Sequence, residues 1–184
     1  GELAARAVAE RSLRQALRLA ADFTPAALSL AAIQRTEGNA REALRTVETA
    51  ALARARSHWP LWHESAYHAA LAGMEQAEGT AEAQGMLGRV LDAVAARLEA
   101  EAGQNAPAWN DLGFVRYRQA VHFSQAERYE QAAACFRRAL ALDPQLVNAG
   151  GSLVDTLRKL GRRDEAEALR REMRARFPQH PFFH

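Results

Sequence analysis

The residues that come nearest to a catalytic pattern are His63, Glu64 and His68. Zinc peptidases use a helical His-Glu-x2-His arrangement, in which histidines four residues apart share one helix face and one metal ion. Here the two histidines are five residues apart, so they diverge by about 140° around a helix. We therefore interpret these histidines, together with His58, as groove or interface residues, and we predict no metal site.

The other patterns that carry chemistry are also missing. The single cysteine, Cys135, adjoins Phe136 on the side of a helix that we expect to be packed, which is typical of an inert core thiol. No glycine-rich phosphate loop follows a strand, and no Ser-His-Asp set can be assembled. The sequence predicts no catalytic residue, no cofactor and no enzymatic activity.

Charge argues against an extended nucleic-acid footprint. The 24 basic and 22 acidic residues leave a net charge of only +2, and Lys159 is the one lysine. A nucleic-acid partner would need a clustered basic face. The segment from Arg158 to Arg176 is locally basic, and two interpretations stay open for it. The favoured one is a solvated helix face with acid–base pairs such as Glu167–Arg171, and the other is a site for an acidic protein or RNA.

Composition says little about the compartment. One cysteine excludes an intrachain disulfide, and no run of about 18 apolar residues could span a bilayer. No signal segment is recognisable at the start, so both cytoplasm and periplasm remain open. The bias toward Arg and Ala is typical of GC-rich bacterial genomes.

A repeat of 34 residues gives the strongest evidence on fold. Pro144 and Pro178 are separated by that interval, and so are Ala9 and Ala43. Such a period marks stacked helical hairpins, each too small to bury its own apolar face without its neighbours. The apolar residues are 48% of the chain, and the most frequent of them is Ala, which favours helix. We predict an all-α, right-handed solenoid of antiparallel helix hairpins.

Breakers divide the chain into about nine predicted helices. Their approximate ranges are 3–20, 25–37, 40–56, 60–77, 80–102, 107–125, 129–142, 146–160 and 163–176.

From Pro107 onward the chain carries a motif of one hairpin. Trp109, Leu112 and Gly113 follow one another in the order Trp-x2-Leu-Gly. Tyr117 comes next, then Ala132-x3-Phe136 and Asp143-Pro144. With these residues the segment resembles the tetratricopeptide repeat family. The last hairpin resembles it through Leu153, Ala166 and Phe177-Pro178, and an earlier phrase, Gly38 to Ala43, matches its turn and following helix.

Two departures from the family pattern affect the expected hairpins. Leu112 and its counterpart Leu153 are 41 residues apart, seven more than the period. These seven residues fall within 118–128, so we expect the first helix of that hairpin to be about two turns longer. The first helix of the chain lacks a hairpin partner, since Ala9 is equivalent by the 34-residue period to Ala43, which lies in the second helix of a hairpin.

The expected division is one solenoid domain over residues 1–184. It comprises a lone or capping helix (1–23), a repeat (24–57) and an irregular long repeat (58–105). A repeat with a lengthened first helix (106–146), a further repeat (147–178) and a tail (179–184) follow.

The resemblance implies that the first helix of each hairpin lines a concave groove for a peptide or a partner helix. Residues one position from the packing stripe share that side of the helix. The candidate groove residues are His63, Tyr67, Asn110, Phe114, Tyr117, Asn148, Asp155 and Arg158. Asn can pair with a peptide backbone, aromatic rings offer rigid contact area, and Arg can hold a carboxylate at two points. The alternative is that these residues are simply exposed, with Phe114 and Tyr117 used partly in packing.

A subgroup of the family clamps a C-terminal carboxylate with Lys, Asn and Arg in successive first helices. This chain offers an incomplete set, which argues against recognition of chaperone tails.

Two aromatic patches leave alternatives open. Trp62 is expected to fill an inter-helix gap, whereas Trp59 could anchor a partner, since Trp is enriched at binding hot spots. Phe182 and Phe183 could cover the end of the solenoid or mark the join to another domain.

We predict a non-catalytic scaffold that binds a protein or peptide segment in its groove with about micromolar affinity, near 8 kcal/mol. The alternative is an accessory or oligomerising part of a larger enzyme or envelope-assembly protein, which would self-associate through the solenoid ends.

Overall fold

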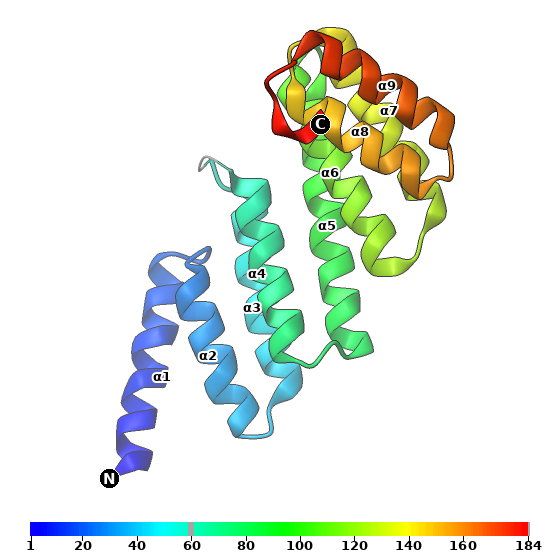
Figure 1. Ribbon diagram of the computed structural model, residues 1–184. Coiled ribbons are helices and arrows are strands. Elements are labelled where there is room, and N and C mark those ends of the chain that lie inside the picture. The colour runs from blue at the N-terminus through cyan, green and yellow to red at the C-terminus, as the bar shows by residue number, and fades with distance from the viewer. Residues whose placement is uncertain (59–60, 184) are drawn as a thin grey trace. The chain divides into compact units, whose positions relative to one another are not determined.

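The computed structural model describes residues 1–58 and 61–183, except for the side chain of Phe182. Within these ranges it contains nine α-helices and one 3₁₀ turn, and no strand (Figure 1). The helices are α1 (Glu2–Leu19), α2 (Thr24–Thr36), α3 (Ala40–Arg56), α4 (Trp62–Gln76), α5 (Ala81–Ala102), α6 (Ala106–Phe123), α7 (Ala126–Leu142), α8 (Val147–Lys159) and α9 (Arg163–Arg176), and the turn is η1 (Pro181–Phe183). The predicted all-α class of helix hairpins is confirmed.

Breakers in the sequence set the helix ends. Pro25 lies in the first turn of α2, where its missing N–H has no partner to lose. The Asn105 side chain caps α6 by accepting a hydrogen bond from the Ala108 N–H at 3.2 Å. Gly38 and Gly161 follow α2 and α8 with φ of +81° and +75°, a conformation that costs glycine little. The predicted start of α4 at Pro60 lies outside the described residues.

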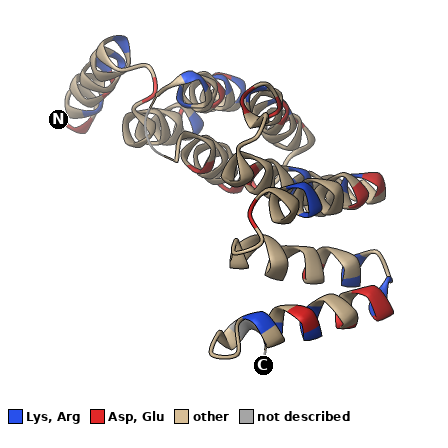
Figure 2. Cartoon of the chain, turned by 90° about the horizontal axis from the view of Figure 1, so that it is seen from above, with Lys and Arg blue, Asp and Glu red and all other residues tan. Residues whose placement is uncertain are grey.

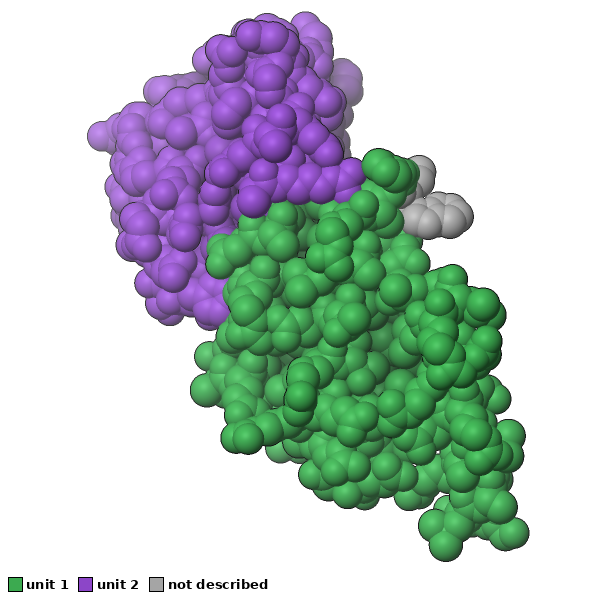
Figure 3. All heavy atoms as spheres, turned by 180° about the vertical axis from the view of Figure 1, so that it is seen from behind, with its two compact units in different colours: residues 1–94 green, residues 95–184 purple. Residues whose placement is uncertain are grey.

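Packing divides the chain into two compact units, Gly1–Val94 and Ala95–His184, which Figure 3 colours separately. The first unit holds α1 to α4 and most of α5, and the second holds the end of α5, α6 to α9 and η1. The division into one domain with four hairpins remains a prediction.

In the first unit, α2 and α3 form an antiparallel hairpin, α4 packs on both, and α1 packs on α2 (Figure 1). Small residues make this packing close. A Cβ atom on Gly73 of α4 would lie 2.6 Å from Cγ1 of Val47 on α3, so only glycine fits there.

In the second unit, α6 and α7 form one hairpin and α8 and α9 the next, while α8 also packs on α7 and α6. Phe136 lies at the centre of the core and is fully buried, with Leu153 and Leu157 in the same cluster. A Cβ atom on Gly113 would lie 2.5 Å from Phe136 Cε1. Phe136 can therefore occupy its position in the core only because residue 113 of the sequence motif is glycine.

The seven added residues are distributed differently from the prediction. Helix α6 has 18 residues and α8 has 13, so part of the added length is in α6 as expected. However, Ser124 adopts a left-handed conformation with φ of +53° and ends α6, and α7 begins at Ala126 rather than near Tyr129. The remaining residues therefore lengthen α7.

Candidate partner-binding surface

The predicted groove depends on contact between the first helices of successive hairpins. In the first unit α2 contacts α4, and in the second unit α6 contacts α8. Six of the eight candidate residues belong to α6 and α8, and we call this set the α6–α8 face. It consists of Asn110, Phe114, Tyr117, Asn148, Asp155 and Arg158.

Tyr117 and Asp155 connect the two helices of this face. Burial is the main cause of a raised pKa of the Tyr117 hydroxyl, and the charges of Tyr129 and Asp155 add to it. A carboxylate raises the pKa of a phenol only at short range, because water screens charges that are further apart. The two residues belong to helices that pack on one another, although they are 38 positions apart in the sequence.

The two aromatic residues of the face are partly used in packing. The Phe114 ring meets the Phe136 ring edge-on, with centroids 5.4 Å apart. Tyr117 meets Tyr129 in the same way at 5.3 Å. Both Phe114 and Tyr117 remain half-buried, so each ring packs on the core and keeps part of its surface accessible.

Asn110 differs from the open position expected of it. Only 7% of this residue is exposed. Its Nδ2 donates to the Asp111 carboxylate at 3.3 Å, whereas its buried Oδ1 has no hydrogen-bond partner among the described residues. An unpaired buried acceptor costs about 1–3 kcal/mol. A ligand reaches this oxygen only if the side chains that cover it move.

The polar residues of α8 are more accessible. Asn148, Asp155 and Arg158 are all exposed. Arg158 is shared between Glu167 at 3.1 Å and Asp155 at 3.9 Å. A ligand carboxylate at Arg158 would therefore compete with two acidic residues of the chain itself.

A comparison with protein families identifies part of this architecture. A family model described as tetratricopeptide repeat matches the chain from α7 through η1. Residues 124–183 match the tetratricopeptide repeat family. The resemblance drawn from the sequence motif is thereby confirmed for this segment. No curated protein matches the sequence.

The matched tetratricopeptide segment includes α8, and therefore Asn148, Asp155 and Arg158. Repeats of this family generally mediate protein–protein interactions. The other candidate residues lie before position 124, where the assignment depends on the motif and on the packing of α6 against α8.

In the first unit, the candidates His63 and Tyr67 do not form an open trough. Each is only 8% exposed. The His63 ring is perpendicular to that of Trp62 with centroids 5.5 Å apart, and Tyr67 contacts the ring of His68 at 5.1 Å. The sequence placed both residues on one predicted helix, which is α4, but it could not show that neighbouring side chains cover them. Their role in binding remains a prediction.

The histidine pattern of α4 is arranged around Glu64. Its carboxylate lies 3.4 Å from His68 Nε2 and 3.8 Å from His63 Nδ1. Over the described ranges 1–58 and 61–183, no group of three or more His, Cys, Asp or Glu side chains is placed to hold a metal ion.

In the basic C-terminal segment four of the eight basic residues form ion pairs with described residues, namely Arg158, Arg162, Arg170 and Arg176. Arg162 contacts Glu165 at 2.6 Å and Glu130 at 3.0 Å, and Arg176 contacts Glu172 at 3.0 Å. Figure 2 shows acidic and basic positions interspersed along these helices. This pattern fits the solvated helix face that the sequence favoured, but the predicted pair Glu167–Arg171 does not form, because Glu167 contacts Arg158 and Arg170 instead. Among the described helices, none is long and apolar enough to cross a membrane.

The structure bears on some of the alternatives that the two aromatic patches left open. Trp62 is buried at 9% exposure, as expected of a residue that fills an inter-helix gap. The proposed anchor Trp59 lies outside the described residues. Phe183 is fully buried and its carbonyl accepts a hydrogen bond from Arg170 Nη1 at 3.3 Å.

A second surface, which no sequence motif indicated, lies between α1 and α3. A groove of about 580 Å³ lies there, lined by Arg18, Arg45 and the apolar residues Leu17 and Leu30. Its lining residues belong to α1, α2, α3 and the turn after α1, and no one sequence motif includes all of them.

Proposed function

We propose that this chain is a non-catalytic interaction module that binds an extended peptide, or an extended segment of a partner protein, along the α6–α8 face. The observation that carries the proposal is the packing of α6 against α8, which combines the half-buried rings of Phe114 and Tyr117 with the exposed polar residues of α8. Asn110 lies on the same helix face, and an amide side chain can meet a peptide group with both its atoms.

The neighbouring residues suit such a ligand. Phe114 and Tyr117 provide half-buried aromatic surface beside Asn110 on the same helix face. Aromatic side chains give large contact areas with few rotatable bonds to order on binding. Asn148 on α8 is exposed and offers a second amide for the backbone.

The charges of the α6–α8 face favour a ligand that is neither strongly acidic nor strongly basic. Asp155 and Arg158 lie 3.9 Å apart, so neither sign of charge prevails there. We infer that recognition depends on backbone hydrogen bonds and apolar side chains more than on ligand charge. Binding should therefore change little with ionic strength.

The experiment uses a phage-displayed library of random twelve-residue peptides, selected on the whole chain. Peptides that bind are synthesised, and their affinity is measured by fluorescence anisotropy. Replacement of both Asn110 and Asn148 by Ala is expected to weaken binding roughly tenfold, because two neutral hydrogen bonds are lost. Far-ultraviolet circular dichroism should stay unchanged.

Asn39→Ala provides the matched control. This asparagine is exposed at the start of α3, where its side chain makes no cap hydrogen bond. Peptides that bind the double variant as tightly as the original chain would refute the role of the α6–α8 face.

A further inference from the structure

The groove between α1 and α3 forms a surface distinct from the α6–α8 face. Leu17 of α1, Leu30 of α2 and Ala50 of α3 give it an apolar floor. Arg18 stands on one wall and Arg45 on the other. With a volume of about 580 Å³, the groove has room for several side chains of a partner.

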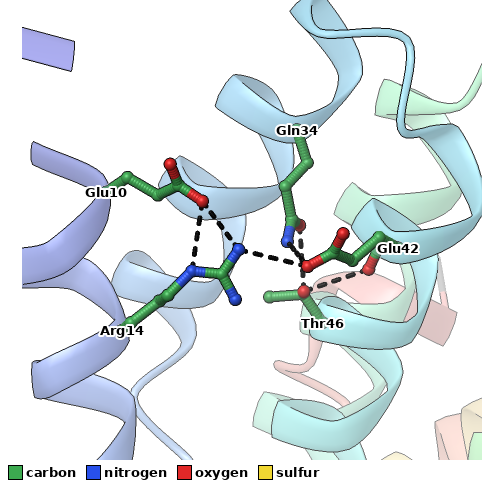
Figure 4. Close-up of polar contacts among 5 residues, drawn as sticks. All are labelled: Glu10, Arg14, Gln34, Glu42 and Thr46. Carbon is green, nitrogen blue, oxygen red and sulfur yellow. Dashed lines mark hydrogen bonds and ion pairs between the residues drawn. The ribbon is translucent and has the colours of Figure 1, made fainter. Parts of the chain in front are cut away.

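Ion pairs cross the groove at both ends. At one end Arg14 of α1 contacts Glu42 of α3 at 3.1 Å (Figure 4). The same carboxylate oxygen accepts a hydrogen bond from Gln34 of α2 at 2.8 Å, and Thr46 donates to Gln34 at 2.9 Å. This network holds α1 beside the α2–α3 hairpin, since α1 has no buried residue of its own.

At the other end, Arg54 of α3 contacts Asp22 at 3.3 Å, just after Ala21 of the groove lining. Arg54 also donates to the Asp22 carbonyl at 2.9 Å. These two bridges tie α1 and the turn that follows it to α3.

The two arginines between the bridges have no carboxylate partner. Arg18 donates from Nε to Oε1 of Gln15, a neutral side chain on the same helix, at 3.0 Å. The Arg45 guanidinium has no hydrogen bond or ion pair with any described residue, and it is exposed. Two positive charges thus face an apolar floor without compensation.

Two other grooves of the chain are also lined by arginines, but most of these arginines form ion pairs. Between α7 and α9, Arg137 contacts Glu165 at 3.4 Å and Arg176 contacts Glu172 at 3.0 Å.

Between α3 and α5, Arg41 contacts Glu82 at 3.3 Å and Arg89 contacts Glu48 at 2.5 Å. Apart from Arg45, which borders this groove as well, each arginine that lines these two grooves has an acidic partner of its own.

We infer that the α1–α3 groove binds an acidic segment of a partner protein. Apolar side chains of the segment would cover Leu17, Leu30 and Ala50, and its carboxylates would pair with Arg18 and Arg45. Guanidinium groups bind carboxylates at two points, which gives orientation as well as attraction. This inference does not depend on the function proposed for the α6–α8 face.

The test uses two synthetic fourteen-residue helical peptides that place Leu at the same positions and carry either Glu or Gln elsewhere. Binding to the whole chain is measured by fluorescence anisotropy at low and at physiological salt. We expect the Glu peptide to bind at least tenfold more tightly than the Gln peptide, with a preference that declines as salt rises.

The decisive variant replaces Arg18 and Arg45 by Gln. It should weaken binding of the Glu peptide about tenfold and leave the Gln peptide unaffected. Arg171→Gln with Arg174→Gln removes the same charge from exposed positions of α9 and should change neither affinity.

Three outcomes would overturn the inference. They are failure of the Glu peptide to bind, equal binding by the Arg18 and Arg45 variant, or an equal loss in the α9 control. The Asn110 and Asn148 variant should bind the Glu peptide normally, which separates this groove from the α6–α8 face.

Discussion

Cys135 shows how an environment decides the chemistry of a residue. It is buried on α7, and burial raises the pKa of its thiol to about 11, with Arg116 opposing that shift and Glu99 supporting it. The thiolate is the reactive form of cysteine. At neutral pH this thiol is therefore protonated and inert, as its place beside Phe136 predicted.

We predict that iodoacetamide modifies Cys135 slowly at pH 7.5 in the native chain and rapidly in 6 M guanidinium chloride. Because the pKa is raised in the folded state, its contribution to stability is complete below the pKa of the unfolded thiol, near 9. That contribution is lost as the pH rises from about 9 to about 11. Urea unfolding at pH 8 and pH 10.5, with Cys135→Ser as control, measures this loss. Native alkylation as fast as in denaturant would contradict the buried position.

At the same scale, the sequence predicted which helices carry the candidate residues but not the exposure of every one. Tyr117 and Asp155 lie on α6 and α8, which pack on one another. The sequence could not predict that Asn110, His63 and Tyr67 are nearly buried, because burial depends on the side chains of other helices. It also missed Arg18 and Arg45, since only the folded chain shows which arginines lack an acidic partner.

At the level of elements, the fit between α6 and α7 depends on the absence of a side chain at position 113. A Cβ atom there would meet Phe136 Cε1 at 2.5 Å and Cδ1 at 2.7 Å. Phe136 is fully buried and has no free space to move into. The close approach of the two helices therefore requires glycine.

We predict that Gly113→Ala destabilises the chain by about 1–3 kcal/mol, the usual cost of overpacking a core. Gly85→Ala on α5 is the control, because the new Cβ atom would be 3.4 Å from the flexible end of Arg89. That change should stabilise helix α5 by about 0.5–1 kcal/mol. Urea unfolding followed by circular dichroism measures both, and a neutral Gly113→Ala would contradict the close packing described.

Helix positions were largely predictable from the sequence because breakers mark most of the turns. Both ends of α3 and of α9 agree with the prediction, because a glycine with positive φ, Gly38 or Gly161, marks the turn before each of these helices. The start of α7 was wrong by three residues. Its turn uses Ser124 in a left-handed conformation, and serine gives no such signal in the sequence.

At the level of the whole molecule, the second unit covers part of its own apolar surface with its C-terminal turn. Phe183 of η1 is fully buried, and η1 packs on α9. The sequence left open whether Phe183 covers the end of the last hairpin or joins another body. Its burial within the same chain fits the first interpretation.

We predict that Phe183→Ala lowers the free energy of unfolding by about 3 kcal/mol, as for other buried phenylalanines. It should also expose apolar surface and increase self-association, which light scattering at rising concentration would detect. Val121→Ala, at a position 51% exposed on α6, is the control and should have little effect. If Phe183→Ala instead dissolved an existing dimer, the residue would be an oligomer contact, as in the alternative of an oligomerising domain.

The central proposal is that the α6–α8 face receives an extended peptide. The most direct measurement is photo-cross-linking from a library-selected peptide that carries a benzophenone group at successive positions, with mass spectrometry of the linked chain. The account predicts cross-links to α6 and α8, around Asn110, Tyr117 and Asp155. Cross-links confined to α7 and α9, or spread evenly over all helices, would contradict it.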